Sequence, residues 1–242
     1  MSTHSERGMT LVEILIAITL LSVLSVAVLV AMRIGFNTMD KTDAHLVHDR
    51  RIANTRRIIE NEIAGFMYSI AWFHPEPRAR ITVYFAEWAP REMRFVTAYS
   101  LDDGWRGRPQ IAVLEVIPAP DNRGVRLIMN EAPYTGPEQT GAMISGISPD
   151  GALSFAPPLP NAQSFVLADR LAYCRFLYLE PPRAPRPAMW RTDWEMSGRV
   201  PLGVRIEMAP LETRPAEAQM TSVTVPINIT RDPATLYVDS PF

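Results

Sequence analysis

His45 and His48 are the clearest candidates for metal ligands in this sequence, and Asp49 follows them directly. A spacing of three residues would place both imidazoles on one face of a helix, where a zinc ion could bind. A tetrahedral site also needs a third and a fourth ligand, and the sequence offers neither at a fitting spacing. We therefore favour an exposed polar helix face, and we expect no bound metal or cofactor.

Three further features resemble reactive or calcium-binding groups only in part. Cys174 lies in an apolar, strand-like run and is expected to be a buried side chain, not a nucleophile. The segment 141–146 differs from a nucleophile elbow in its spacing and lacks a strand-to-helix context. Asp102, Asp103 and Asp150 are each followed closely by glycine, which indicates turns and not a calcium loop. The sequence thus predicts no catalytic residue and a protein that is not an enzyme.

Glu13 lies where an acid is costly. It is the only charged residue between Met9 and Met32, an apolar run longer than the roughly 20 residues that span a bilayer as a helix. The run contributes about −6 kcal/mol to insertion, whereas a central acid would cost about 2.5 to 3.5 kcal/mol. The sequence therefore predicts a membrane helix over 9–32. An intramembrane carboxylate is functional by default, and the alternative is that Glu13 only reaches back to the headgroups.

A cleaved secretory signal peptide is the other interpretation of this run. Its apolar core would be about 7 to 15 residues long, with a small-residue cleavage site behind it. The run here is longer and no Ala-x-Ala pattern follows it, while a short polar leader, 1–8, precedes it. We therefore expect processing at the leader, with the apolar segment retained.

The residues from Gly8 to Leu15, Gly-Met-Thr-Leu-Val-Glu-Ile-Leu, resemble the leader junction of type IV pilins and type II secretion pseudopilins. The resemblance implies cleavage after Gly8 by a prepilin peptidase on the cytoplasmic face, followed by N-methylation of Met9. It also implies a single-pass protein of the bacterial inner membrane whose C-terminal part lies in the periplasm. Cleavage would create a new amine at Met9, which Glu13 of a neighbouring subunit can neutralise during assembly. The commonest first residue in the family is Phe, which Met9 replaces here.

Chain length, net charge and cysteine count limit which other functions the chain could have. The chain has 242 residues and a net charge of −2, so it offers no basic field to attract nucleic acid. Its single cysteine excludes an intramolecular disulfide. About 200 residues follow the anchor, enough for one or two modest domains with a core.

Proline divides the chain at residue 75. All 22 prolines lie at or beyond Pro75, and a proline costs about 3 kcal/mol inside a helix, so one helix is permitted from Met9 to His74. Its second part, 33–74, has the spacing of an amphipathic helix, and Gly35 and Gly65 are places where it bends or loosens. The apolar positions are Ile52, Ile59, Ile63, Phe66, Met67 and Ile70, and the polar ones are Arg50, Arg51, Arg56, Arg57, Glu60 and Glu62.

Beyond Pro75 apolar residues recur with period two, which is typical of strands. A first antiparallel sheet, packed on the helix, is expected from the runs at 81–85, 93–99, 111–117 and 125–129. The Pro- and Gly-rich insert at about 131–160 predicts a long connection. A second sheet is expected from 165–168, 171–180, 202–208 and 223–229, followed by a frayed tail from Asp232. The predicted fold is α+β and pilin-like, with a long N-terminal helix packed on antiparallel β-sheets and a β-rich domain over 75–242.

The C-terminal half resembles the J-type minor pseudopilins of type II secretion. The pattern is an aromatic run from Leu171 to Glu180, then Trp190 and Trp194, then Val200 to Met208 and a closing run from Val223 to Ile227. The resemblance implies a structural subunit at or near the tip of the periplasmic pseudopilus that helps to initiate its assembly. The implied partners are the I- and K-type minor pseudopilins, the major pseudopilin and the inner-membrane assembly platform. The proline-rich insert departs from the usual family length.

Trp190 and Trp194 are the most interface-like residues of the soluble part, because Trp and the neighbouring Arg dominate interface hot spots. A loop that folds both aromatic side chains onto its own sheet is an equally good interpretation. Two other functions stay open for the chain. One is a minor pilin of a type IV pilus, serving adhesion, twitching or DNA uptake. The other is a membrane-anchored periplasmic enzyme, which would need a convergent set of acids, bases or ligands that the sequence lacks.

Overall fold

A computed structural model describes residues 11–101, 105–149, 151–157, 164–194, 198–212 and 222–228, and it gives no account of the side chains at 34–48, 105 and 106. Gly8 and Met9, the two residues of the expected processing site, therefore lie outside the described residues. So do Asp102, Asp103, Asp150 and the tail from Asp232. The chain forms two compact units, Met1–Arg50 and Arg51–Phe242, and each is described by itself.

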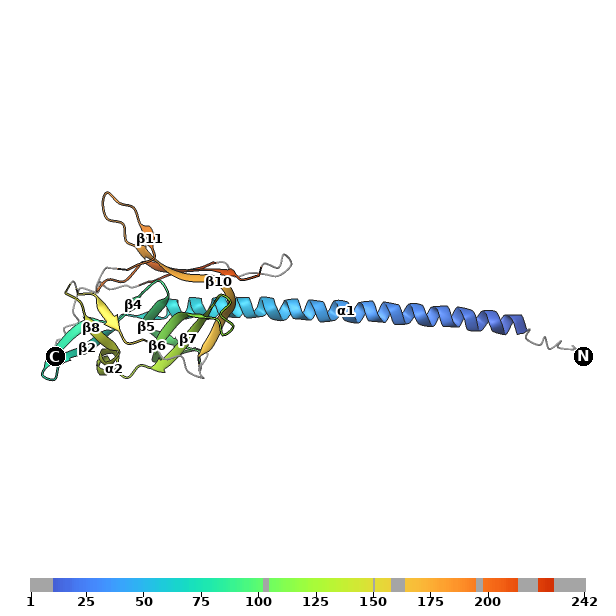
Figure 1. Cartoon of the computed structure of the whole chain (residues 1–242), viewed down its shortest axis with the longest axis horizontal. Helices are drawn as coiled ribbons and strands as arrows, with labels where there is room; N and C mark the ends of the chain where they lie inside the picture. The colour runs from blue at the N-terminus through green and yellow to red at the C-terminus, as the bar shows by residue number, and fades with distance from the viewer. Residues whose placement is uncertain are drawn as a thin grey trace, which may run out of the picture. The chain divides into compact units, whose positions relative to one another are not determined.

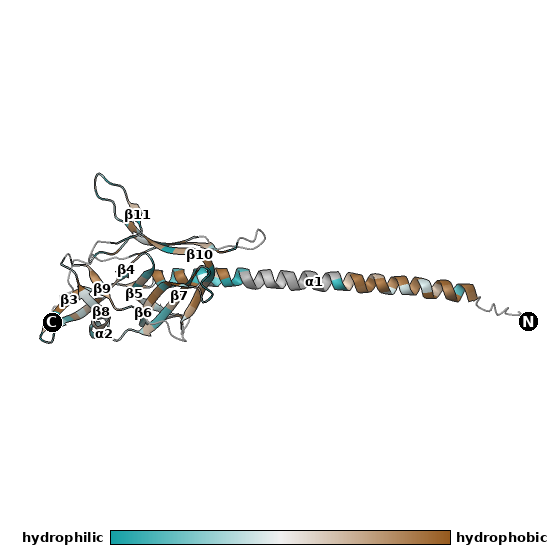
Figure 2. Cartoon of the chain, in the orientation of Figure 1, coloured by the Kyte–Doolittle hydropathy of each residue, from teal (hydrophilic) through white to brown (hydrophobic). Residues whose placement is uncertain are grey.

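The first element is the helix α1, Leu11–Ala64, of 54 residues. It contains no proline, so every residue can take part in the helical hydrogen-bond ladder. In the first unit the described side chains of α1 are almost all apolar, as the brown colour in Figure 2 shows. The long helix expected from the proline-free stretch is thus confirmed up to Ala64.

Helix α1 ends at Ala64, ten residues before the predicted end at His74, and that part of the prediction is wrong. The main-chain N–H of Gly65 still bonds to Asn61 O at 2.8 Å, but Gly65 O already accepts from Ala98 N at 2.8 Å. The chain then continues as strands β1, Phe66–Met67, and β2, Ile70–Glu76. Pairing with strands distant in sequence outweighs the local helical spacing here, because these aromatic and branched residues suit a pleated surface.

The domain over Arg51–Phe242 is built on one nine-stranded antiparallel sheet (Figure 1). The hydrogen-bonded order is β1-β5-β6-β7-β10-β12-β13, with β4 beside β5 and β11 beside β10. The long strands are β5, Glu92–Ser100; β6, Trp105–Pro118; β7, Val125–Pro133; β10, Phe165–Glu180; and β12, Gly203–Pro210. The short ones besides β1 are β4, Glu87–Trp88; β11, Met189–Arg191; and β13, Ser222–Pro226.

The two predicted sheets are one sheet, because β7 and β10 pair and so join the two halves of the domain. The N-terminal part of β10 pairs with β7 from Phe165 to Leu171, and its C-terminal part pairs with β12 from Leu171 to Tyr178. The register shifts where Arg170 adopts a positive φ of 54°. Two runs that looked like separate strands, 165–168 and 171–180, are therefore a single irregular strand.

The insert at about 131–160 is not an irregular connection, and this prediction is also wrong. It contains the end of β7, the short helix α2, Pro137–Ala142, and a hairpin of β8, Ile144–Ile147, and β9, Leu153–Phe155. Helix α2 lies against β2, since a side chain at Gly141 would collide with the main chain of Trp72. Thr140 is buried and donates its hydroxyl hydrogen to Ile70 O at 3.1 Å. A contact made by one glycine or one threonine produces no periodic pattern in the sequence. The sequence alone therefore does not predict that this insert is folded.

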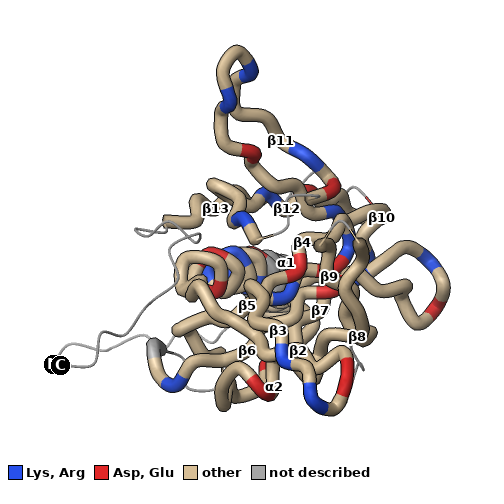
Figure 3. Tube along the Cα trace, turned by 90° about the vertical axis from the view of Figure 1, so that its left-hand side faces the viewer, with Lys and Arg blue, Asp and Glu red and all other residues tan. Residues whose placement is uncertain are grey.

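The remaining strand is β3, Ala79–Tyr84, which forms a separate two-stranded sheet with β2. The main core lies between the C-terminal part of α1 and the nine-stranded sheet, and it includes the fully buried Phe95, Phe176 and Tyr178. Acidic and basic residues are interspersed over the strands and loops of this domain (Figure 3). The predicted α+β class is confirmed: an N-terminal apolar helix is followed by an antiparallel sheet domain, which is consistent with a pilin-like fold.

Candidate functional site

The apolar segment Leu11–Arg33 is the most unusual surface of the chain. It spans 23 residues, and none of it is buried. Large side chains along it are widely exposed, with Leu11 at 82% and Leu21 at 62%. The segment is long and apolar enough to cross a membrane, and it fits a membrane anchor. So large an apolar surface marks a site of contact with lipid or with other apolar helices.

Two hydroxyl groups of this segment, those of Thr19 and Ser22, are satisfied within the helix itself. Thr19 Oγ1 donates to Ile16 O at 2.8 Å, and Ser22 Oγ donates to Ile18 O at 2.8 Å. A polar group without a partner costs several kcal/mol in hydrocarbon, about 2 to 7 by transfer measurements. Internal hydrogen bonds remove that cost, so Thr19 and Ser22 are compatible with an apolar environment.

Glu13 is the acidic residue of this segment. It lies near the beginning of the described part of α1, and the structure leaves its side chain exposed among Leu and Ile neighbours. Its expected partner, the amine of Met9, lies outside the described residues. The pairing of Glu13 with a neighbouring subunit therefore stays a prediction.

The C-terminal part of α1, over 51–64, is held by the chain's own sheet. Ile59 and Ile63 are fully buried in the main core, as the amphipathic spacing predicts. Thr55 Oγ1 donates to Leu167 O at 3.0 Å, and Thr97 Oγ1 donates to the main-chain oxygen of Glu62 at 3.0 Å. These contacts fix the last turns of the helix on β5 and β10.

Glu62 departs from the prediction that it belongs to the polar, exposed face. It is 0% exposed, and neither carboxyl oxygen makes a hydrogen bond of normal geometry within the described part of the chain. Burial, and after it the neighbouring Glu131 carboxylate, raises the pKa of Glu62 to about 9. Glu131 itself accepts hydrogen bonds from Leu101 N at 2.9 and 3.1 Å. Glu62 is therefore a neutral, protonated acid at pH 7.

The two predicted interface tryptophans pack mainly on their own domain. The Cζ atom of Arg205 lies 4.2 Å from the ring centroid of Trp190, a cation-π geometry. Trp194 Nε1 donates to Arg199 O at 3.0 Å, and its ring meets that of Tyr178 edge-on at 6.3 Å between centroids. These are the contacts expected of a loop folded onto its own sheet. An additional role of either ring in an interface stays a prediction.

Of the candidates for reactive chemistry, the structure describes Cys174 and the segment 141–146. Cys174 is buried, as predicted, and burial raises the pKa of its thiol to about 12, so the nucleophilic thiolate is scarce at neutral pH. The segment 141–146 runs from the end of α2 into β8. No group of three or more His, Cys, Asp or Glu side chains suited to a metal occurs among the described residues. The side chains of His45 and His48 lie outside that description.

Comparison with known proteins concerns the N-terminal segment. A family model described as the prokaryotic N-terminal methylation motif matches residues 3–29, a stretch that contains Gly8, Met9 and Glu13. The chain thus carries the N-methylation motif of prokaryotic pilins and pseudopilins, and the matched stretch includes most of the apolar segment Leu11–Arg33. Neither the curated proteins nor the solved structures give a match to this chain.

Proposed function

We propose that this chain is a minor pseudopilin of a type II secretion system, of the J type. It serves as a structural subunit at or near the tip of the periplasmic pseudopilus and helps to initiate pseudopilus assembly for protein export. The observation that carries the proposal is the bare apolar segment Leu11–Arg33, most of which lies within the matched methylation motif. A helix of this kind needs lipid before assembly and neighbouring helices after it.

In this proposal the chain is first processed at its leader. Prepilin peptidase cleaves after Gly8 on the cytoplasmic face, and Met9 becomes the N-methylated first residue of the mature protein. The segment 9–32 then anchors the subunit in the inner membrane. The sheet domain lies in the periplasm, on the other side of the bilayer from the leader.

Glu13 gives the subunit its assembly register. A carboxylate costs about 2.5 to 3.5 kcal/mol in the middle of the bilayer and less near the interface, where Glu13 lies, and an opposite charge beside it offsets part of this cost. The new amine at Met9 of one subunit supplies that charge to Glu13 of the next. Apolar side chains of Leu11–Arg33 then pack against the same segment of neighbouring subunits.

The residues of the pattern that resembles the J type lie on adjacent strands. This placement supports the proposal that they belong to one part of the domain. The run Leu171–Glu180 lies on β10, Val200–Met208 includes most of β12, and the closing run lies on β13. These strands are neighbours in the sheet, in the order β10-β12-β13. Proposed partners are the I- and K-type minor pseudopilins, the major pseudopilin and the assembly platform.

Two measurements on a deletion strain test the proposal. Loss of protein export, restored by the wild-type gene, supports the secretion function. Loss of surface pili or twitching with normal export would instead assign the chain to a type IV pilus, whose minor pilins share the methylation motif. Co-purification of the full chain with the I- and K-type subunits from detergent extracts tests the partners. Absence of both subunits, with export intact in the deletion strain, would contradict the J-type assignment.

A further inference from the structure

The connection from β10 to β11 projects from the sheet domain, beside the label β11 in Figure 1. We name residues 181–188 of this connection, Pro-Pro-Arg-Ala-Pro-Arg-Pro-Ala, the arm. Residues 182–188 are all exposed, and Met189 after them is 47% exposed. The arm therefore adds little hydrophobic stabilisation to the domain, and its side chains are accessible to a partner.

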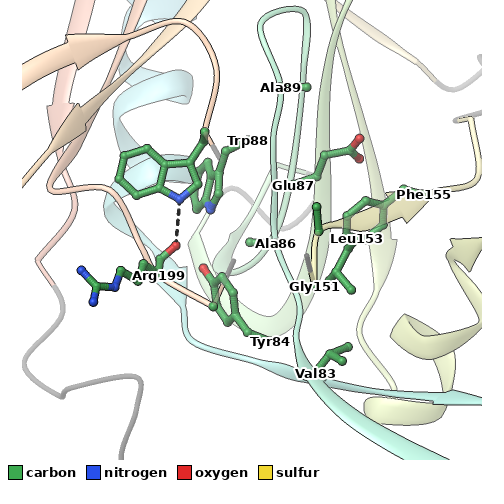
Figure 4. A pocket seen from close by; sticks show the side chains of 13 residues that line it. Val83, Tyr84, Ala86, Glu87, Trp88, Ala89, Gly151, Leu153, Phe155 and Arg199 are labelled. Carbon is green, nitrogen blue, oxygen red and sulfur yellow. Dashed lines mark hydrogen bonds between the residues drawn. The ribbon is translucent and has the colours of Figure 1, made fainter. Parts of the chain in front are cut away.

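The base of the arm is fixed to the sheet domain on both sides. Leu179 lies opposite Trp190 in the ladder of β10 and β11, and the ring of Trp190 lies against Arg205. Trp194, in the loop after β11, donates from Nε1 to Arg199 O at 3.0 Å, the dashed line in Figure 4. The arm therefore leaves the domain from a defined position.

Main-chain hydrogen bonds close the tip of the arm into a tight turn. Arg183 N donates to Arg186 O at 2.9 Å, and Arg186 N donates back to Arg183 O. The two residues form an antiparallel bridge. Residues that face each other in this way project their side chains from the same face, with Cβ atoms about 5 Å apart. The turn thus places two basic side chains side by side.

The tip combines two positive charges with no acidic residue of its own. Arg183 and Arg186 are the charged residues of the arm, and Figure 3 shows basic residues at the end of the projecting connection. Arg183 has a further interaction within the chain, and both residues are exposed. Like charges directly opposite each other in an antiparallel pair are destabilising. A carboxylate bound to both guanidinium groups would replace this repulsion by attraction.

The acidic residues that flank the arm have partners of their own. Glu180 Oε2 lies 3.5 Å from Arg191 Nη1, and Asp193 Oδ1 accepts a hydrogen bond from Thr192 at 3.2 Å. Glu195 lies outside the described residues. The described carboxylates of this connection therefore belong to the base of the arm and not to its tip.

Prolines make the arm stiff. They occupy four of its eight positions, 181, 182, 185 and 187. Each proline ring fixes φ near −65° and reduces the conformations open to the chain. A stiff segment loses less conformational entropy when it binds, so the two arginines are pre-organised for a partner.

The chemistry of the arm favours an acidic polypeptide over a lipid surface. Segments that enter an anionic membrane interface combine basic residues with Trp, Phe or Leu. The arm has none of these, and the net charge of the chain is −2. The planar fork of an arginine, in contrast, matches a carboxylate through two parallel hydrogen bonds.

We propose that the arm docks on an acidic surface of a partner polypeptide, with carboxylates of the partner bound to Arg183 and Arg186. The pre-organised turn presents both guanidinium groups to the partner at once. The inference goes beyond the proposed function, since it concerns the sheet domain alone and holds whichever assembly the anchor serves.

Peptide binding to the full chain in phosphatidylcholine nanodiscs tests this inference. The probe is a fluorescein-labelled decapeptide of Gly and Ser with four central Glu residues, followed by fluorescence anisotropy. In about 10 mM salt it should bind about ten-fold more tightly than the same peptide with four Gln residues. High salt should remove most of this difference, because exposed charges are screened. Equal affinities, or binding to phosphatidylglycerol vesicles without binding of the Glu peptide, would overturn the proposal.

Charge reversal at the tip locates the binding site. The double variant Arg183→Glu with Arg186→Glu should weaken binding of the Glu peptide about ten-fold. Replacement of both by Lys keeps the charges without the fork, so it should weaken binding only about two- to three-fold. All these changes are at exposed positions, so melting curves should match that of the wild type.

The matched control is Arg78→Glu, which reverses an exposed arginine beside a proline in the turn between β2 and β3. It makes the net charge more negative without changing the arm, so affinity for the Glu peptide should change less than two-fold. Equal weakening by Arg78→Glu and by the double reversal, or unchanged affinity in the double reversal, would contradict the assigned site.

Discussion

The two ends of helix α1 differ in the relation between the polarity of their side chains and the burial of those side chains. Over Leu11–Arg33 the helix is apolar and none of it is buried, whereas over 51–64 it carries many charges and yet packs into the main core. Each end also has an acid in an unusual setting: Glu13 is exposed among Leu and Ile side chains, and Glu62 is buried. The chain thus buries its more polar helical segment and leaves the apolar one bare.

This contrast indicates what each segment of the helix packs against. An apolar surface is stabilised by removal from water, at about 25 cal/mol per Å². Packing on the sheet domain removes Ile59 and Ile63 from water. Among the described residues, no comparable burial is seen for the side chains of Leu11–Arg33. The bare segment fits a membrane anchor, and its motif implies assembly with other pilin or pseudopilin subunits.

Matched truncations of the two segments should give the largest difference. Ile63→Ala should lower the free energy of unfolding of the sheet domain by about 2 to 5 kcal/mol, because it leaves a cavity in the core. Leu20→Ala removes a similar side chain from a position that is 65% exposed, and it should leave domain stability unchanged. Urea unfolding of the full chain in micelles, followed by tryptophan fluorescence, measures both. Similar losses in the two variants would contradict the contrast.

The buried acid should make domain stability depend on pH. The pKa of Glu62 is about 9 in the fold against an ordinary value of 4.5. The unfolded chain releases this proton first, so the contribution of Glu62 to stability is complete below pH 4.5 and falls as the pH rises to about 9. At pH 7 the loss is on the order of 3 kcal/mol. Glu62→Gln should remove this slope and increase stability at pH 8.

The control for this prediction is Glu60→Gln, on the same turn of α1. Glu60 accepts a hydrogen bond from Arg56 at 2.8 Å at the surface. Its removal should leave the pH profile of unfolding between 5 and 9 nearly unchanged, which urea titrations at several pH values would show. Retention of the full pH slope in Glu62→Gln would mean that other groups cause it.

The sequence predicted those features that depend on local spacing. The apolar anchor, the helix as far as Ala64 and most strand positions follow from proline placement and from periods of 3.6 and two. The helix end, the joining of two expected sheets through β7 and β10, and the folded insert depend on contacts between distant residues. Gly65 was expected to loosen the helix, but only the approach of β5 turns it into the helix end.

The same limit applies to the functional surfaces. The residues Gly8, Met9 and Glu13 are close in sequence and lie within the stretch that the family model matches, and their individual roles stay predictions. The burial of Glu62 depends on which strands pack beside it, and no local pattern carries that information.

Enlarging the helix end should have a smaller effect than removing the core contact. A Cβ atom at Gly65 would lie 2.6 Å from Thr97 Oγ1 and 3.0 Å from Asn61 O. Gly65→Ala should therefore destabilise the domain by about 1 to 3 kcal/mol, the usual range for overpacking. Gly146→Ala is the matched control, because nothing lies within 4 Å of its added methyl group. Equal melting temperatures of the two variants would exclude a tight contact between Gly65 and β5.

The smallest effect is expected from the exposed ion pair of α1. Arg56 and Glu60 are four residues apart and meet at 2.8 Å with both side chains largely in solvent. Arg56→Ala should cost about 0.3 to 0.5 kcal/mol, and less in high salt. Urea unfolding at low and high salt measures this. A loss above that of Gly65→Ala would show that Arg56 has a role beyond this pair.

Cross-linking within the bare segment tests the central claim most directly. Leu24→Cys places a thiol in Leu11–Arg33, and its oxidation in the native strain should yield disulfide-linked subunits that co-purify with the assembled pilus or pseudopilus. Adding Glu13→Ala should leave the amount of protein in the membrane unchanged and abolish the cross-linked species. Equal cross-linking with and without Glu13 would contradict the account that this carboxylate admits the apolar helix to an assembly.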